Sequence, residues 1–158
     1  MRHIICFGNP LHGDDGFGPA VYQRLAALPL PDDVRIFDAG ASGPAALALF
    51  EDCDEAIIVD AMASGAAPGQ IAELPPDAAF IECRVSGHGA GVGYLLQALA
   101  ARTEPTPRIR IIAAEAVRVA PFQPGLSEPV INAVEEAFAL LSSYFARNGH
   151  ESDGHESA

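Results

Sequence analysis

The stretch that decides the fold is IICFGNPLHGDDGFGP, residues 4–19, where an apolar run leads into a loop rich in glycine, proline and acidic residues. Four consecutive apolar residues from Ile4 to Phe7 are typical of a strand buried on both faces of a parallel sheet. Residues 19–28 then have the composition of a helix, with a proline that is tolerated in the first turn. The order strand, short loop and helix predicts the first βα unit of an α/β protein, with Asp14 and Asp15 in its loop.

The rest of the chain repeats this alternation of apolar runs and helical patterns. In the last helix, from Ser127 onward, apolar side chains recur at three- and four-residue steps on one face. Residues 66–84 show no clear helix and have room for an antiparallel strand. The predicted strands are 34–37, 57–59 and 108–114, with weaker ones at 70–74 and 79–85, and the other predicted helices are 44–50 and 91–102.

This pattern predicts one domain over residues 1–147, followed by a disordered polar tail at 148–158. We expect a three-layer α/β/α sandwich around a mostly parallel, mixed sheet of about five strands.

Composition excludes several classes of function. The chain has 158 residues, a formal charge of −12, nine arginines and no lysine, so it has no basic patch typical of nucleic-acid binding and no P-loop or Schiff-base lysine. No apolar run approaches the ~20 residues of a membrane span, and we identify no signal peptide. Three cysteines without a CxxC pair favour a reducing, cytoplasmic setting. The absence of a coiled-coil pattern favours a monomer.

Polar residues gather where ligands bind to open parallel sheets, at the carboxyl ends of the strands. Three such features are Asp14-Asp15 after the first strand, Asp60 directly after residues 57–59, and Ser86-Gly87-His88 before the helix that begins near Gly91. Two carboxylates and an imidazole on three loops could form a site for a divalent metal such as nickel or zinc, with coordination positions left open.

Each of these residues also has a structural alternative. Asp15 could cap the first helix, Asp60 could hydrogen-bond a loop, and Ser86 could cap the helix after it. A single histidine among glycines, such as His88, is commonly solvated. From spacing alone, both interpretations stay open.

A serine mechanism is a weaker alternative. Ser42, Asp60 and His88 follow the hydrolase order Ser…Asp…His, but they span fewer than fifty residues. The segment Gly40-Ala41-Ser42-Gly43-Pro44 lies between a predicted strand and a helix, yet its last residue is proline where a nucleophile elbow has glycine. We expect Ser42 to shape a turn or line the cleft.

The chain resembles the hydrogenase maturation proteases from Ile4 to about Leu141. The resemblance rests on Gly8-Asn9-Pro10-Leu11 followed by Asp14-Asp15-Gly16-Phe17-Gly18, on Ile58-Val59-Asp60-Ala61, on the Ser86/His88 segment before a helix, and on Ala114-Glu115. It implies an endopeptidase that removes the carboxyl-terminal extension of a nickel-iron hydrogenase large-subunit precursor. It also implies that Asp15, Asp60 and His88 bind nickel, which is supplied by the substrate and not tightly held by the protease.

The same resemblance leaves the chemistry partly open. Nickel could take part in hydrolysis by polarising the scissile carbonyl, or it could serve only as a checkpoint, with Asp14, Asp38 or a water as general base. Asp14, Asp38, Gly40 and Ser42 are the expected substrate contacts. The run Asp38-Ala39-Gly40-Ala41-Ser42-Gly43 departs from the Asp-Gly-Gly-Thr-like run usual in the family, and extra glycines surround His88. A hydrolase with its own metal or a serine nucleophile, and a non-catalytic nickel-dependent chaperone, are the other hypotheses.

Overall fold

The fold is built on a five-stranded sheet in the order β2-β1-β3-β5-β4. The computed structural model describes residues 1–41, 44–76, 92–102 and 104–148. Strands β1, β2, β3 and β5 are parallel, and β4 pairs antiparallel with β5. The strands are β1 (Arg2–Phe7), β2 (Val34–Gly40), β3 (Glu55–Met62), β4 (Ile71–Leu74) and β5 (Arg108–Glu115). The mixed, mostly parallel sheet predicted from the sequence is confirmed, including its antiparallel strand.

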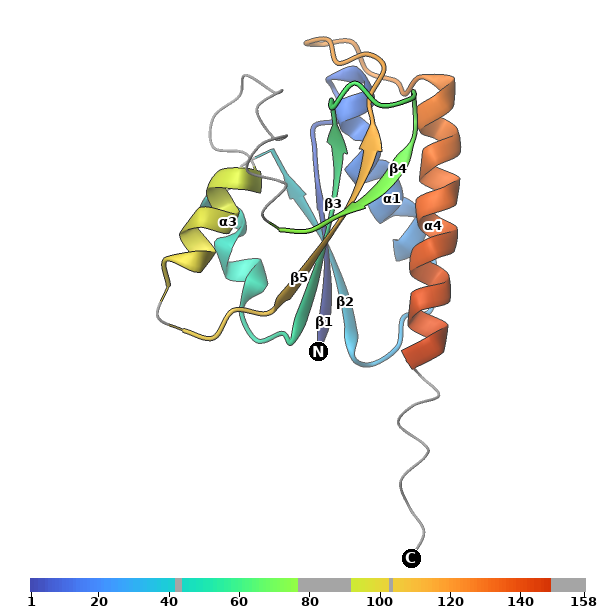
Figure 1. Cartoon of the computed structure of the whole chain (residues 1–158). Coiled ribbons are helices and arrows are strands. Elements are labelled where there is room, and N and C mark those ends of the chain that lie inside the picture. Colours follow the sequence, from blue (N-terminus) through green and yellow to red (C-terminus); the bar gives the residue numbers. More distant parts are fainter. Residues whose placement is uncertain (42–43, 77–91, 103, 149–158) are drawn as a thin grey trace, which may run out of the picture.

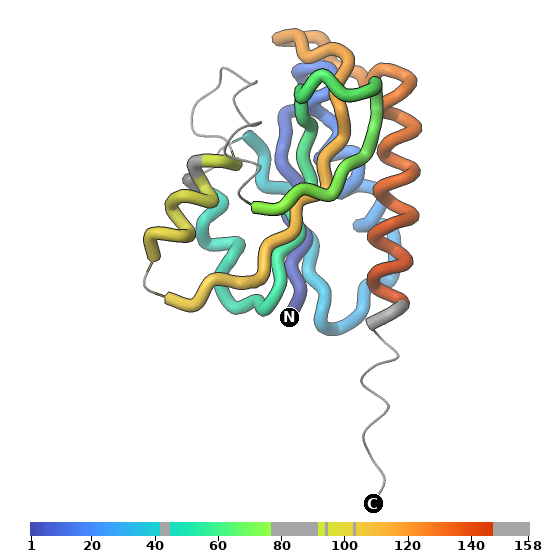
Figure 2. Tube along the Cα trace, in the orientation of Figure 1, coloured from blue at the N-terminus to red at the C-terminus, as the bar shows by residue number. Residues whose placement is uncertain are grey.

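Helical segments cover both faces of the sheet, which gives the predicted three layers (Figure 1). One face is covered by α1 (Phe17–Ala26) and α4 (Glu128–Asn148), and the other by the 3-10 helix η2 (Pro44–Phe50) and by α3 (Val92–Ala100). A second 3-10 helix, η1 (Gly13–Gly16), joins β1 to α1. Figure 2 shows α4 running alongside the sheet opposite α3 and η2.

The alternation of side chains along the central strands divides the core into two parts. On β1, Ile4 and Cys6 point to the α1 and α4 layer, while Ile5 and Phe7 point to the α3 and η2 layer. Ile4, Ile5 and Cys6 are fully buried. Burial of an isoleucine side chain contributes roughly 1.5–3 kcal/mol, so Ile4 and Ile5 of this strand each stabilise one of the two layers.

Several element boundaries differ from the sequence prediction, among them those of α1, which begins and ends two residues earlier, and of β2, which continues to Gly40. Three further differences concern the helix at 44–50, β3 and α4. Residues 44–50 form a 3-10 helix and not an α-helix. Strand β3 continues to Met62, so Asp60 lies within the strand and not at its end. Helix α4 extends to Asn148, one residue into the predicted tail. The predicted strand at 79–85 and residues 149–158 lie outside the described residues. Within the described ranges, none of the helices has the length and apolar character that a membrane span needs.

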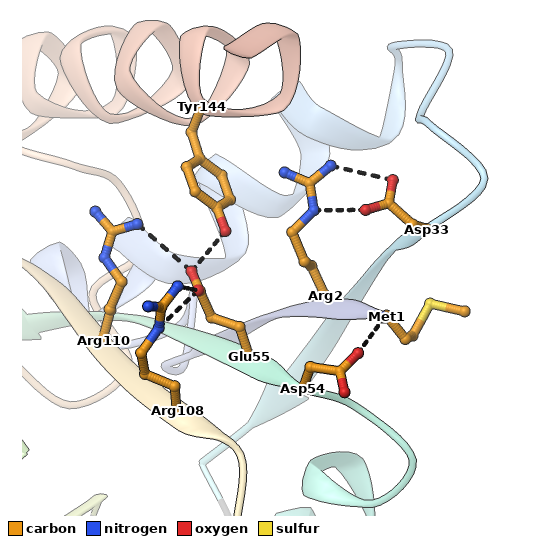
Figure 3. A network of polar contacts seen from close by, with 8 residues as sticks. All are labelled: Met1, Arg2, Asp33, Asp54, Glu55, Arg108, Arg110 and Tyr144. Carbon is orange, nitrogen blue, oxygen red and sulfur yellow. Dashed lines mark hydrogen bonds and ion pairs between the residues drawn. The ribbon is translucent and has the colours of Figure 1, made fainter. Parts of the chain in front are cut away.

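A buried carboxylate ties α4 to the amino end of the sheet. Glu55 begins β3, is 5% exposed, and accepts hydrogen bonds from the Arg108 guanidinium and, at 2.5 Å, from the Tyr144 hydroxyl of α4 (Figure 3). Arg110 lies within ion-pair distance at 3.5 Å. Burial raises the pKa of Glu55, but the bonds from Tyr144 and Arg108 and the two guanidinium charges outweigh it and lower the pKa.

A second ion pair lies at the same end of the sheet. Arg2 donates two hydrogen bonds to Asp33, from Nε at 2.7 Å and from Nη2 at 3.1 Å. Its guanidinium also lies over the Tyr144 ring, 5.0 Å from the ring centre. Arg110 of β5 also lies over this ring, 5.1 Å from its centre, so Tyr144 contacts charged groups from three strands, and these contacts fix the last turns of α4 against the sheet (Figure 3).

We predict that Glu55→Gln lowers the free energy of unfolding at pH 7 by about 1–2 kcal/mol, because the amide lacks the charge that pairs with Arg108, whose side chain is 77% exposed, and with Arg110. The pKa of Glu55 is lower in the folded chain than in the unfolded chain. Its contribution is therefore complete above the ordinary glutamate pKa of about 4.3 and is lost as the pH falls below it. Urea unfolding at pH 7 and pH 3 should show a difference between wild type and variant that shrinks at the lower pH.

The matched control is Asp54→Asn. Asp54 is the neighbouring residue, but its carboxylate is exposed and pairs with the amino terminus. We expect this variant to unfold as wild type does. Equal effects of the two substitutions would contradict the role assigned to Glu55.

Candidate functional site

Two carboxylates meet at the carboxyl end of the two central strands. Asp15 lies in η1, which follows β1, and Asp60 lies on the adjacent strand β3, one residue beyond Val59, which pairs with Cys6 of β1. Burial, and next the nearby charge of Asp15, raise the pKa of Asp60 well above its usual range. The Ala61 amide donates to Asp60 Oδ1 at 2.8 Å and opposes this shift. The structure thus brings together two of the three metal ligands predicted from the sequence.

Asp15 is positioned by the loop that precedes it. The Asn9 amide donates a hydrogen bond to Asp15 Oδ2 at 2.9 Å. At Gly8 the backbone has φ +141°, and a side-chain Cβ there would lie 2.0 Å from the Asp15 carbonyl oxygen, so this position requires glycine. The N-caps of η1 and α1 are His12 and Gly16, and neither makes a side-chain capping bond. The capping role considered for Asp15 is therefore not what its carboxylate does.

Asp14, the neighbour of Asp15, is 0% exposed and holds two loops together. Its carboxylate accepts hydrogen bonds from the amides of Val117, Arg118 and Ser127 and from the Ser127 hydroxyl, at 2.7–2.9 Å. Burial acts to raise the pKa of Asp14, but these bonds outweigh it and lower the pKa. With its oxygens engaged in this way, Asp14 acts as a structural clamp, and its geometry does not favour the substrate contact or general base expected from the sequence.

Asp38 and Gly40 lie at the same edge, at the carboxyl end of β2. Asp38 is exposed, and its Oδ1 accepts a hydrogen bond from the Gly40 amide at 3.3 Å. The Gly40 carbonyl accepts from the Gly8 amide at 3.0 Å, which joins this loop to the loop that carries Asp15. Both residues therefore remain candidates for substrate contact, and Asp38 remains a candidate general base.

The thiol of Cys6 lies in the core on the α1 and α4 face of the sheet, near enough to Asp38 and Asp60 for their charges to act on it. Cys6 is fully buried, and burial, followed by the charges of Asp38 and Asp60, raises its pKa far above the ordinary cysteine value. The group is therefore a protonated thiol and a poor nucleophile or metal ligand. The structural role predicted for this cysteine is confirmed.

The third predicted metal ligand, His88, and the predicted contact Ser42 lie outside the described residues, as does Ser86. Among the residues that the structure describes, no three His, Cys, Asp or Glu side chains are placed to hold a metal ion. Ile58 and Met62 point to the α3 and η2 layer, so alternation places Asp60 on that same face. His88 precedes the first residue of α3 by four positions in the sequence.

A second buried clamp was not recognised as such from the sequence. Glu115, at the end of β5, is 4% exposed and accepts hydrogen bonds from the amides of Ser64 and Gly65 and from the Ser64 hydroxyl at 2.7 Å. It fixes the loop that follows β3 and hence the end of the strand that carries Asp60. An acidic residue directly after an apolar run was its signal in the sequence, but that signal does not distinguish a clamp from a ligand.

Comparison of the sequence with known protein families identifies the family of this chain. The sequence profile described as hydrogenase maturation protease matches residues 19–143. The chain belongs to the hydrogenase maturation protease family. The matched range includes Asp60 and His88 and begins after Asp15.

Solved structures of this family share the whole fold. The hydrogenase maturating endopeptidase HybD of Escherichia coli is 27% identical, with a TM-score of 0.81 over 94% of this chain and 93% of that chain. The endopeptidase HycI of Escherichia coli is 25% identical, with a TM-score of 0.79 over 91% of this chain and 90% of that chain. These likenesses support the protease activity predicted from the sequence.

A curated relative matches over a shorter segment. A Methanocaldococcus jannaschii protein, provisionally named a hydrogenase maturation protease, is 49% identical over 51 residues, which are 32% of this chain and 33% of that protein. The matched segment thus spans about a third of the length of this relative.

We predict that the substitution of Asp by Asn changes the free energy of unfolding differently at the adjacent positions 14 and 15. Asp14→Asn should lower the free energy of unfolding by about 2–3 kcal/mol, because an amide cannot accept all the bonds that the clamp accepts. Asp15→Asn should leave stability unchanged or raise it by up to about 1 kcal/mol, because it removes a charge that opposes ionisation of Asp60. Thermal and urea unfolding at pH 7 measure both. Equal losses would contradict the separation of roles.

Proposed function

We propose that this protein is an endopeptidase that removes the carboxyl-terminal extension of a nickel-iron hydrogenase large-subunit precursor after nickel insertion. Family membership supports the reaction class. The observation that carries the more specific proposal is the pair of carboxylates, Asp15 and Asp60, at the carboxyl edge of the sheet, where neither has an ion-pair partner among the described residues.

Two adjacent carboxylates favour a cation between them. In this proposal the cation is nickel bound to the precursor, and His88 adds an imidazole to the two carboxylates. Oxygen and nitrogen donors of this kind bind nickel while leaving positions for the ligands that the precursor itself supplies. The placement of Asp60 on the α3 face supports the inclusion of His88, which precedes α3 in the sequence.

This arrangement explains selectivity for the loaded precursor. A precursor without nickel would bring no charge to offset the repulsion between Asp15 and Asp60, so binding would lose its electrostatic contribution. Asp38, which is exposed at the carboxyl end of β2, is then the described candidate to accept a proton from an attacking water, whereas the Asp14 carboxylate already accepts hydrogen bonds from Val117, Arg118 and Ser127. We propose a cytoplasmic monomer, in keeping with its composition.

The proposal predicts that purified protein shortens nickel-loaded precursor and leaves nickel-free precursor intact, as intact-protein mass spectrometry would show. Asp15→Asn, Asp60→Asn and His88→Ala should each lower the rate of processing by at least about a hundredfold while the chain stays folded. Asp32→Asn and His155→Ala are controls of the same residue types, because neither residue belongs to the proposed ligand set, and they should process the precursor at the wild-type rate.

The other hypotheses give different results in the same assay. Equal cleavage of loaded and empty precursor would refute nickel recognition. Loss of activity in Ser42→Ala, together with cleavage of the nickel-free precursor by wild type, would indicate a serine mechanism. Binding of the precursor without any mass decrease would indicate a chaperone.

A further inference from the structure

Exposed apolar side chains are concentrated beside the candidate site. Among the described residues, seven large apolar side chains are exposed, and four of them lie on two neighbouring loops. These four are Leu11 (52% exposed), Val117 (53%), Val119 (46%) and Phe122 (81%). We refer to them as the apolar rim. Single exposed apolar residues need no explanation, but a cluster of them commonly marks an interaction surface.

The two loops of the apolar rim are joined to each other and to Asp15. The Gly13 amide donates to the Gln123 carbonyl at 2.8 Å, and the Asp14 amide donates to the Arg118 carbonyl at 2.8 Å. The rings of His12 and Phe122 are in edge contact with their centres 5.8 Å apart. The loop after β5 crosses the end of the sheet where β3 and β5 finish (Figure 1). The Asp14 clamp therefore fixes the apolar rim relative to the carboxylate site.

Two independent features of Phe122 cost free energy in the isolated protein. It exposes most of an aromatic side chain, and its φ is +57°, a left-handed conformation that is unusual for a bulky residue. Neither feature is offset by burial of the ring. Strained residues of this kind are held in place by their surroundings and occur at ligand-binding positions.

The chemistry of the apolar rim selects an apolar occupant. In residues 116–126 the sole charged side chain is Arg118, although the chain as a whole carries a net charge of −12. The four side chains expose roughly 400 Å² in total, about half of what each partner contributes to a standard stable interface. This area is too small for a stable dimer through the apolar rim alone. It suits a short segment of a substrate that is also held at a second point.

We infer that the apolar rim docks an apolar segment of the hydrogenase large-subunit precursor beside the bond to be cut, an inference that rests on the proposed function. The carboxylates bind the charged part of the substrate, and the apolar rim binds the polypeptide next to it. Since the Asp14 clamp links the two surfaces, docking of the segment sets the position of the scissile bond relative to Asp15 and Asp60.

The test uses the double variant Leu11→Gln/Phe122→Asn of the full chain with nickel-loaded precursor. Asparagine tolerates the left-handed backbone, so the variant should be no less stable to heat than wild type. We expect KM to rise at least tenfold with kcat within about twofold of wild type. The control Leu140→Gln removes an equally apolar, 45% exposed side chain from α4, and it should change neither constant.

Several results would overturn the inference. The first is an unchanged KM in the double variant, and the second is a fall in kcat at constant KM. The third is that wild type sediments as a dimer and the double variant as a monomer, because the apolar rim would then bind a second copy of the chain. If wild type binds the precursor by calorimetry without cutting it, the proposed endopeptidase activity fails. The docking inference then stands if the double variant binds at least tenfold more weakly than Leu140→Gln. If wild type neither binds nor cuts the precursor, both fail.

Discussion

The hydrogen bonds to the buried Asp14 carboxylate are the constraint on which the carboxyl edge of this protein depends. They join the loop after β1 to the loop between β5 and α4, segments more than a hundred residues apart in the chain. An ionised group can be enclosed so completely because three amides and a hydroxyl satisfy its oxygens. Asp15 is adjacent in sequence, yet no ion pair to it occurs among the residues that the structure describes. The clamp thus makes Asp14 part of the rigid scaffold and leaves Asp15 available for the proposed site.

The same division recurs across the edge of the sheet. Glu115 accepts hydrogen bonds from Ser64 and Gly65 and so fixes the loop after β3. Asp60, on that strand, is instead destabilised in its charged form by the nearby charge of Asp15. Holding two carboxylates together in the absence of a cation lowers the stability of the fold. The clamps at this edge, and the Glu55 network at the opposite end of the sheet, offset that loss (Figure 3). The repulsion between Asp15 and Asp60 lies at the proposed site, where a bound cation would relieve it.

Much of the fold could be predicted from the sequence because its signals are local. The apolar runs and the helical spacing of apolar residues after Ser127 indicate which side chains are buried. The structure confirms the layers, the mixed sheet and the buried face of α4. The proximity of Asp15 and Asp60 was predictable as well, because parallel strands end at a common edge. The division of roles between Asp14 and Asp15 was not, because it depends on amides of Val117 and Arg118 that come near only after folding. Phe122 was also missed, since neither its exposure nor its backbone conformation has a sequence signature.

The buried thiol of Cys6 has a consequence for how firmly this protein would retain a metal. Sulfur binds nickel strongly as a thiolate, but the thiol of Cys6 stays protonated and is buried on the α1 and α4 face of the sheet, so it supplies no thiolate ligand to an ion near Asp60. Carboxylates bind such an ion more weakly and exchange it faster. In the proposed function the nickel is bound to the precursor and has to remain there after cleavage, so a weakly binding set of oxygen and nitrogen donors suits that role. A site of this composition favours brief contact with a metal over permanent uptake of it.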